Sequence, residues 1–204
     1  MISSIRKYLS QWGSTEPNTS KLSRHFTYNL ISVAVLAVCG LALNMLIGHI
    51  FGPETLGVFN QVFALYILFS QVAVLGLQFS STTFAAQCSD KSSVDLLFTS
   101  AIFIVAITSG ILAIAVGLSA HHIGNILNSK DVGIGMAFAA PGLFFFSVNK
   151  VILASLNGIM KMGHYAFFVG LRYVLLLLAL VAVVILRYPG EKLPIVFTIS
   201  EGAL

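Results

Sequence analysis

The sequence predicts an all-α polytopic membrane protein with five full transmembrane helices and a truncated sixth. Of its 204 residues, 57% are hydrophobic and 9% are charged, whereas water-soluble domains carry about 25% charged residues. The apolar residues form charge-poor runs of the roughly 20 residues that a helix needs to cross about 30 Å of hydrocarbon. Strands of a membrane β-barrel would be shorter and would alternate apolar with polar residues. The expected spans are residues 26–50, 58–84, 96–118, 134–157 and 164–186, with a partial span at 193–204.

The first span follows a polar leader, residues 1–25, which has no apolar core and is therefore not a cleavable signal peptide. We expect this leader to lie in the cytosol. Phe51–Gly57 separates the first span from the second. Pro53 fixes φ in this segment, and its glycines adopt conformations that other residues resist. The segment predicts a tight turn that makes the first two spans an antiparallel pair.

Small residues recur along the third span, and a proline interrupts the fourth. Small side chains spaced three and four residues apart let two helix backbones approach closely. Pro141 lacks an N–H, so we expect a kink in the fourth helix and a freed carbonyl that a neighbouring helix must satisfy. The longest outer connection is predicted at residues 121–133. The small residues of the third span are Ala106, Gly110, Ala113 and Gly117.

The fifth span carries Arg172, and the sixth segment begins near Leu193 and contains Glu201. This last segment is about half of the length that a span requires. We therefore expect the chain to be a fragment or the product of a truncated gene.

Basic residues in the connections indicate orientation, because lysine and arginine are enriched on the cytosolic side of membrane proteins. A cytosolic N-terminus puts six basic residues on the cytosolic side and three on the opposite side. The six are Arg6, Lys7, Lys21, Arg24, Lys91 and Lys161, and the three are Lys130, Arg187 and Lys192.

Two further cations, Lys150 and Arg172, lie inside apolar spans, where a charge is costly and often marks a ligand or a pathway. A hairpin centred near Lys161 puts both at a similar depth, roughly 12 Å from the cytosolic boundary at 1.5 Å per residue. Together they predict an anion site open to a water-filled cavity. The alternatives are that Lys150 extends its ammonium to the headgroups, and that Arg172 either does the same or forms a structural pair.

The remaining polar residues of the spans are weaker candidates. Glu201 is expected in the outer half of the sixth segment, away from the depth of Arg172, as a coupling-ion site or a local polar contact. Gln71 and Gln78 are seven residues apart and share a face, and with Asn44 they are candidates for lining a cavity or for hydrogen bonding across helices. Asn149 adjoins Lys150 but points elsewhere on its helix.

Several classes of function lack any signature in the sequence. There is no nucleophile motif, no HExxH sequence, no phosphate-binding loop and no aspartate-rich metal motif. The two cysteines have no metal-binding or disulfide spacing, and the adjacent His121 and His122 lack further ligands. The net charge of +4 forms no basic stripe that would bind nucleic acid. We therefore expect no enzyme activity, no cofactor, no metal and no nucleic acid partner.

Three stretches resemble the polysaccharide or O-antigen flippases of the multidrug/oligosaccharidyl-lipid/polysaccharide exporter superfamily. They are Phe51–Asn60, Leu75–Gln78, and Ala154–Gly158 followed by Lys161 and by Leu171–Tyr173. The resemblance covers residues 22–204. It implies the N-terminal lobe of a MATE-like fold, in which two lobes of six helices surround a central cavity.

The resemblance also implies a multi-pass protein of the bacterial inner membrane that moves undecaprenyl-pyrophosphate-linked oligosaccharide between leaflets. Lys150 and Arg172 match the basic residues that meet the anionic lipid carrier in that family. The implied partners are the lipid-linked oligosaccharide, membrane lipids and a polysaccharide polymerase. Two alternatives stay open: a multidrug exporter of the same superfamily, and a membrane scaffold that transports nothing.

Overall fold

Seven α-helices and one short 3-10 helix make up the part of the chain that the structure describes. The computed structural model describes residues 19–87 and 90–204, so residues 1–18 of the predicted leader lie outside it. Five of the helices are long and apolar enough to span a membrane, which confirms the prediction of an all-α chain with five full apolar helices and a shorter last one. The helices are α2 (Thr19–Ile50), α3 (Gly52–Val74), α4 (Leu77–Gln87), α5 (Lys91–Ile126), α6 (Lys130–Gly158), α7 (Met162–Ile185) and α8 (Ile195–Ala203), with the 3-10 helix η1 at Gly190–Lys192.

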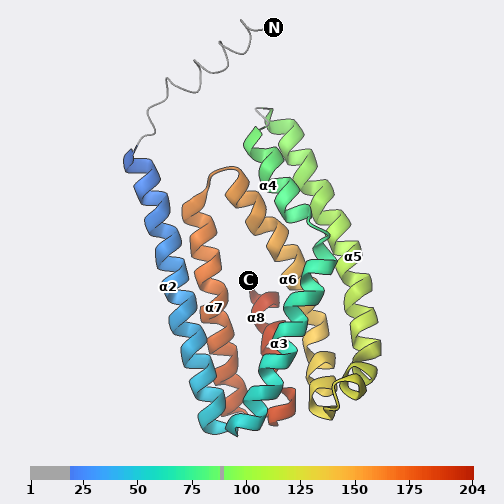
Figure 1. The fold of residues 1–204 in the computed structure, drawn as a ribbon. Coiled ribbons are helices and arrows are strands. Elements are labelled where there is room, and N and C mark those ends of the chain that lie inside the picture. The colour runs from blue at the N-terminus through green and yellow to red at the C-terminus, as the bar shows by residue number, and fades with distance from the viewer. Residues whose placement is uncertain (1–18, 88–89) are drawn as a thin grey trace, which may run out of the picture.

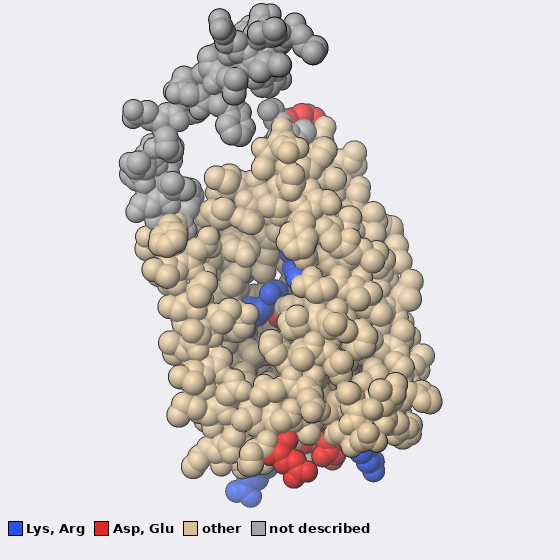
Figure 2. Space-filling model, in the orientation of Figure 1, with Lys and Arg blue, Asp and Glu red and all other residues tan. Residues whose placement is uncertain are grey.

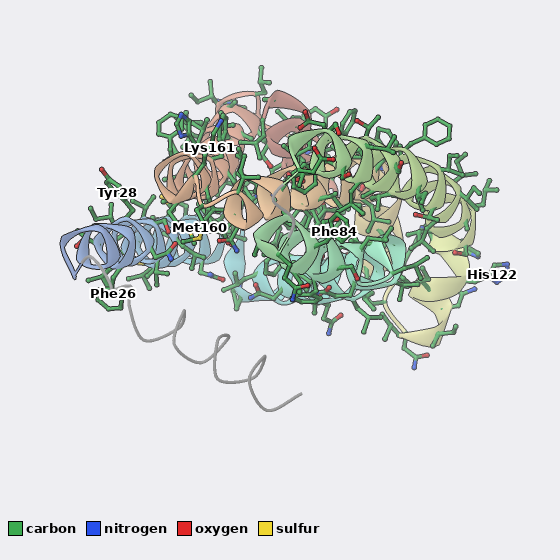
Figure 3. The ribbon with its side chains drawn as sticks, turned by 90° about the horizontal axis from the view of Figure 1, so that it is seen from above. Phe26, Tyr28, Phe84, His122, Met160 and Lys161 are labelled. Atoms are coloured by element: carbon green, nitrogen blue, oxygen red, sulfur yellow. The ribbon has the colours of Figure 1, made fainter. Side chains whose placement is uncertain are left out.

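The long helices run up and down the same axis and form two groups (Figure 1). α2 packs along α7 on one side, and α3 to α6 form the other side, with α8 packed against both α6 and α7. Figure 3 looks down from the end at which α2 begins, where Lys161 lies in the turn between α6 and α7. At this end Gly163 of α7 lies against the ring of Tyr28 of α2. α5 begins, at Lys91, at the same end of the bundle as the turn between α6 and α7 (Figure 1).

The predicted second span, residues 58–84, is wrong in its boundaries and its continuity. α3 begins six residues earlier, at Gly52, so most of the expected turn at Phe51–Gly57 is helical. The helix then ends at Val74, because Leu75 and Gly76 have positive φ values of 52° and 76°. A right-handed helix cannot continue through two such residues, so α4 is a separate helix of 11 residues.

The third span is longer than its prediction of residues 96–118. α5 has 36 residues, and only residues 127–129 separate it from α6, so the expected outer connection at 121–133 is almost entirely helical. His121 and His122 therefore lie on a helix, and Figure 3 shows His122 pointing outward at the periphery of the bundle. Hydropathy alone underestimated this helix because its last two turns carry polar residues.

The α5–α6 contact is the close helix packing that small residues predicted. Gly110 faces Phe144, and Gly117 faces Ala140 across the interface. The two helices come closest near the turn that joins them, where a Cβ added to Gly133 would lie 2.9 Å from the carbonyl oxygen of Ala120. Only glycine fits at this crossing, so the strip of small residues extends beyond the four identified from the sequence.

α6 is the central helix, and α2, α5 and α7 present apolar side chains to the surroundings. The core includes fully buried Tyr66, Met136 and Leu143, which come from α3 and α6. On the outer surfaces, large aliphatic side chains such as Leu118 and Ile185 are 81% and 74% exposed. Exposed apolar surface of this extent on long helices is what contact with lipid acyl chains requires.

The first turn of α5 is capped by Asp90, whose carboxylate accepts hydrogen bonds from the hydroxyl and N–H groups of Ser93 and Ser92. These bonds stabilise the charged form and lower the pKa of Asp90 to about 2. The lowered pKa means that the cap stabilises the folded protein at pH values above about 4, the pKa of an aspartate in the unfolded chain. This stabilisation is lost as the pH falls through the pKa of Asp90 in the folded protein.

We expect Asp90→Ala to lower the melting temperature of the purified protein at pH 7, because the cap of α5 is lost. The difference from the unsubstituted protein should shrink as the pH falls below about 4, since acid protonates the carboxylate. Thermal unfolding followed by intrinsic fluorescence measures both effects. Asp95→Ala, one turn into the same helix, is the control, and equal melting of the Asp90 and Asp95 variants at pH 7 would contradict the prediction.

Candidate functional site

The two cations of the spans meet at one aromatic ring. Lys150 of α6 and Arg172 of α7 are both partly buried. The Lys150 ammonium lies 5.4 Å from the centroid of the Phe146 ring, and the Arg172 guanidinium carbon lies 4.7 Å from it. Phe146 precedes Lys150 by four residues, so both lie on the same face of α6. The short turn at Ile159–Lys161 thus brings the cations together, as the sequence predicted.

Arg172 forms an ion pair with Glu201 of α8. The Nε atom of Arg172 lies 2.8 Å from Oε1 of Glu201, and the two side chains are 13% and 4% exposed. The prediction that Glu201 is not at the depth of Arg172 is therefore wrong. The connection after α7 folds back into the bundle, with Leu193 and Pro194 buried, so α8 begins inside the protein.

Asn149 is a site residue that the sequence did not identify as one. Its side-chain Nδ2 donates to the backbone carbonyl of Glu201 at 2.9 Å and to the Oε2 atom of Glu201 at 3.1 Å. The residue does point away from Lys150, as expected, but toward α8. The sequence did contain a signal for this role. Asn149 lies next to a cation inside a span, and amide side chains in spans commonly form hydrogen bonds to other helices.

Lys150 has a different partner. Its ammonium donates a hydrogen bond of 3.4 Å to the hydroxyl of Ser70, which in turn donates to the carbonyl of Ile67 on α3. Among the described residues, Arg172 and Glu201 form the one pair whose basic nitrogen and carboxylate oxygen lie within 4 Å. No described carboxylate therefore neutralises Lys150. The alternative that Arg172 forms a structural pair is consistent with this geometry, whereas the ammonium of Lys150 is bonded to a neutral hydroxyl and keeps its charge uncompensated by any described carboxylate.

Arg172 also keeps unused hydrogen-bonding capacity. Its Nε and Nη2 atoms are buried, and neither makes a hydrogen bond within the described part of the chain, although Nε lies 2.8 Å from Oε1 of Glu201. Buried polar atoms are nearly always hydrogen-bonded, so an unpaired one requires an explanation. A guanidinium presents its donors in a planar fork that fits carboxylate or phosphate oxygens. The cluster formed by Asn149, Lys150, Arg172 and Glu201, hereafter the charged cluster, thus contains two cations, one carboxylate and a free donor.

Figure 2 shows where the charged cluster meets the surface. Blue basic atoms and a trace of red lie in a hollow in the middle of the face shown, whose other charged atoms lie at its upper and lower ends. The hollow lies between the α2–α7 pair and the group of α3 to α6 in Figure 1. A pocket of about 140 Å³ between α6 and α7 is lined by Asn149 and Phe168, and not by the two cations.

α8 is fixed to α6 at the turn that contains Pro141. The hydroxyl of Thr198 accepts from the N–H of Gly142 at 3.0 Å and donates to the carbonyl of Phe138 at 2.8 Å. These are the two groups that a regular helix would join directly. The carbonyl of Gly142 accepts a further hydrogen bond of 2.8 Å from the hydroxyl of Tyr66. Neighbouring helices thus supply hydrogen bonds to Phe138 and Gly142 beside Pro141. The carbonyl that Pro141 itself frees is that of Ala137, and the predicted partner for it stays a prediction.

The other predicted candidates have hydrogen bonds outside the charged cluster. Nε2 of Gln78 donates to Oε1 of Gln71 at 3.2 Å. The two side chains thus meet across the break between α3 and α4, and the prediction that they share a face of one continuous helix is wrong. Asn44 donates to the carbonyl of Gly40 and accepts from Nδ2 of Asn60, which ties α2 to α3. Within residues 19–87 and 90–204, no group of three or more histidine, cysteine or acidic side chains is arranged to hold a metal ion.

Comparisons of the chain with protein-family models, with curated proteins and with solved structures find no match.

Proposed function

We propose that the chain is the N-terminal lobe of a flippase that moves an undecaprenyl-pyrophosphate-linked oligosaccharide across the bacterial inner membrane, with its N-terminus in the cytosol. The observation that supports the proposal best is the excess of positive charge in the charged cluster. Arg172 is offset by Glu201, whereas Lys150 has no described carboxylate beside it. An unpaired cation inside spanning helices is costly, so an anionic ligand that neutralises it would bind favourably.

The position of the cluster suits a pyrophosphate headgroup that enters from one leaflet. Lys150 and Arg172 lie in the half of α6 and α7 that is nearer to the turn with Lys161, which is the cytosolic end in the proposed orientation. The headgroup would bind there first. Rocking of this lobe against a second one would then open the cavity to the opposite side, as in other transporters built from two halves.

The charge balance argues against the two alternatives. A multidrug exporter that carries cationic drugs needs an acidic cavity, whereas this cluster has two cations and one carboxylate. A scaffold that transports nothing has no need of an unpaired ammonium at this depth, because a partly buried lysine without a carboxylate reduces stability.

The experiment replaces Lys150 with methionine, which keeps the length of the side chain and leaves the Arg172–Glu201 pair in place. In bacteria that lack the chromosomal gene, we expect the Lys150→Met protein to support at most about a tenth of the surface polysaccharide made with the unsubstituted protein, because losing one charge-assisted hydrogen bond costs about 1.5–3 kcal/mol. Arg172→Ala should cause a loss at least as large.

Lys192→Met is the matched control for Lys150→Met. The ammonium of Lys192 lies 5.6 Å from the ring of Phe138, also on α6, so it makes the same kind of contact at the outer end of the bundle. We expect normal polysaccharide output from this variant at equal protein level. Normal output from Lys150→Met and Arg172→Ala as well would refute the anion site and favour the scaffold.

A further inference from the structure

Glu201 contacts Arg172 in the way that an anionic ligand would. Its Oε1 atom lies 2.8 Å from Nε of the guanidinium, and carboxylate and phosphate oxygens compete for the same donors because both are anionic acceptors. The contact is an ion pair by distance, whereas neither Nε nor Nη2 makes a hydrogen bond to an acceptor among the described residues. The guanidinium is therefore paired in charge with Glu201, while two of its nitrogen atoms still lack a hydrogen-bond acceptor.

Hydrogen bonds from α6 hold Glu201 in this position. Asn149 donates both to its carboxylate and to its backbone carbonyl, so the amide fixes the side chain and the end of α8 together. The carboxylate is 4% exposed, and α8 is anchored to α6 by Thr198, three residues before Glu201. Glu201 thus cannot move far from Arg172 without loss of these hydrogen bonds.

We propose that Glu201 is an internal competitor of the anionic ligand, so that the ligand engages Lys150 first and reaches Arg172 only by displacing or sharing the carboxylate. This inference rests on the proposed anion site and adds its regulation. The other charged and titratable side chains around Glu201 are Arg172 and Tyr173 on α7 and Tyr66 on α3, while Lys150 lies beside Arg172, at the ring of Phe146 that both cations share. None of these described side chains supplies a second carboxylate, so within the described part of the chain Glu201 is the acidic group that would set the affinity.

The test measures the affinity of the purified full chain for inorganic pyrophosphate in lipid nanodiscs by titration calorimetry. We expect Glu201→Gln to bind pyrophosphate about tenfold more tightly than the unsubstituted protein, within the range of coupling between linked sites. Arg172→Gln should weaken binding. In the double variant with both substitutions, the gain from Glu201→Gln should vanish, because the competitor acts through Arg172.

Two further variants keep the test decisive. Glu191→Gln removes the same charge from η1 at the outer end of the bundle and should leave the affinity unchanged. Glu201→Asp keeps the charge but withdraws the carboxylate by one methylene, so a smaller gain in affinity is expected even if Glu201→Gln does not fold.

The proposed competition is refuted if folded Glu201→Gln binds pyrophosphate no more tightly than the unsubstituted protein. Where the glutamine variant does not fold, the same result with Glu201→Asp refutes it. A tenfold gain that persists in the Arg172→Gln background would also overturn it. If instead Arg172→Gln and Lys150→Met both bind pyrophosphate as tightly as the unsubstituted protein, the anion site itself is refuted, and the proposed function with it.

Discussion

Arg172→Met is expected to destabilise the protein by about 3–5 kcal/mol, because it leaves the carboxylate of Glu201 buried without its counter-charge. Glu201 is 4% exposed, and Asn149 alone would remain to satisfy it. The double variant Arg172→Met with Glu201→Leu should regain most of that stability, since replacing both members of a buried ion pair with apolar groups of similar volume is often neutral or stabilising. Equilibrium unfolding in mixed micelles measures the three free energies of unfolding.

The double variant also separates stability from binding. It should unfold like the unsubstituted protein yet bind less pyrophosphate, because the guanidinium is absent. Arg187→Met is the control, since Arg187 lies after the end of α7, outside the spanning segments. If the single and double variants at Arg172 were equally unstable, the ion pair would not be the source of the loss.

Gly142→Ala is expected to cost about 1–3 kcal/mol as an overpacking substitution and to loosen α8. A Cβ at this position would lie 2.8 Å from the backbone nitrogen of Thr198 and 2.9 Å from its Cα. Backbone atoms of a packed helix have little freedom to move aside, so α8 must shift, and the bridging hydroxyl of Thr198 shifts with it. Thermal unfolding and limited proteolysis of the last helix measure the effect.

Gly57→Ala is the matched control for this substitution. Gly57 lies within α3, and an added Cβ would have no heavy atom within 4 Å, so alanine should be neutral or slightly stabilising through its higher helix propensity. Equal unfolding temperatures for the Gly142 and Gly57 variants would show that α8 does not pack as closely as the structure describes.

The number and order of the long helices were predictable because burial in lipid imposes a simple rule. Runs without charges long enough to cross the bilayer must be helical, and five such runs are present. The break at Leu75 and Gly76 was not predictable in this way, because both residues are apolar and no proline marks the site. Helix ends that carry polar residues, such as the last turns of α5, also escape a rule based on hydropathy.

The meeting of Lys150 with Arg172 was predictable because a short turn fixes how two adjacent helices align. The contact between Arg172 and Glu201 was not. Counting 1.5 Å per residue along α7 and α8 assumes that the connection between them lies outside the bundle, whereas Leu193 and Val196 are fully buried. The contact of Asn149 with α8 depends on the same return of the chain into the bundle, so it could not be predicted from the sequence either.

The anchoring of α8 has a mechanical consequence. Thr198 and Glu201 belong to one helix of nine residues, and a helix this short moves as a rigid rod. A displacement that separates the carboxylate from the guanidinium must withdraw the hydroxyl from the opened turn of α6 or unwind the rod between them. A change in the pairing of Glu201 would therefore be felt one helical turn away, at the hydrogen bonds of Thr198 beside Pro141.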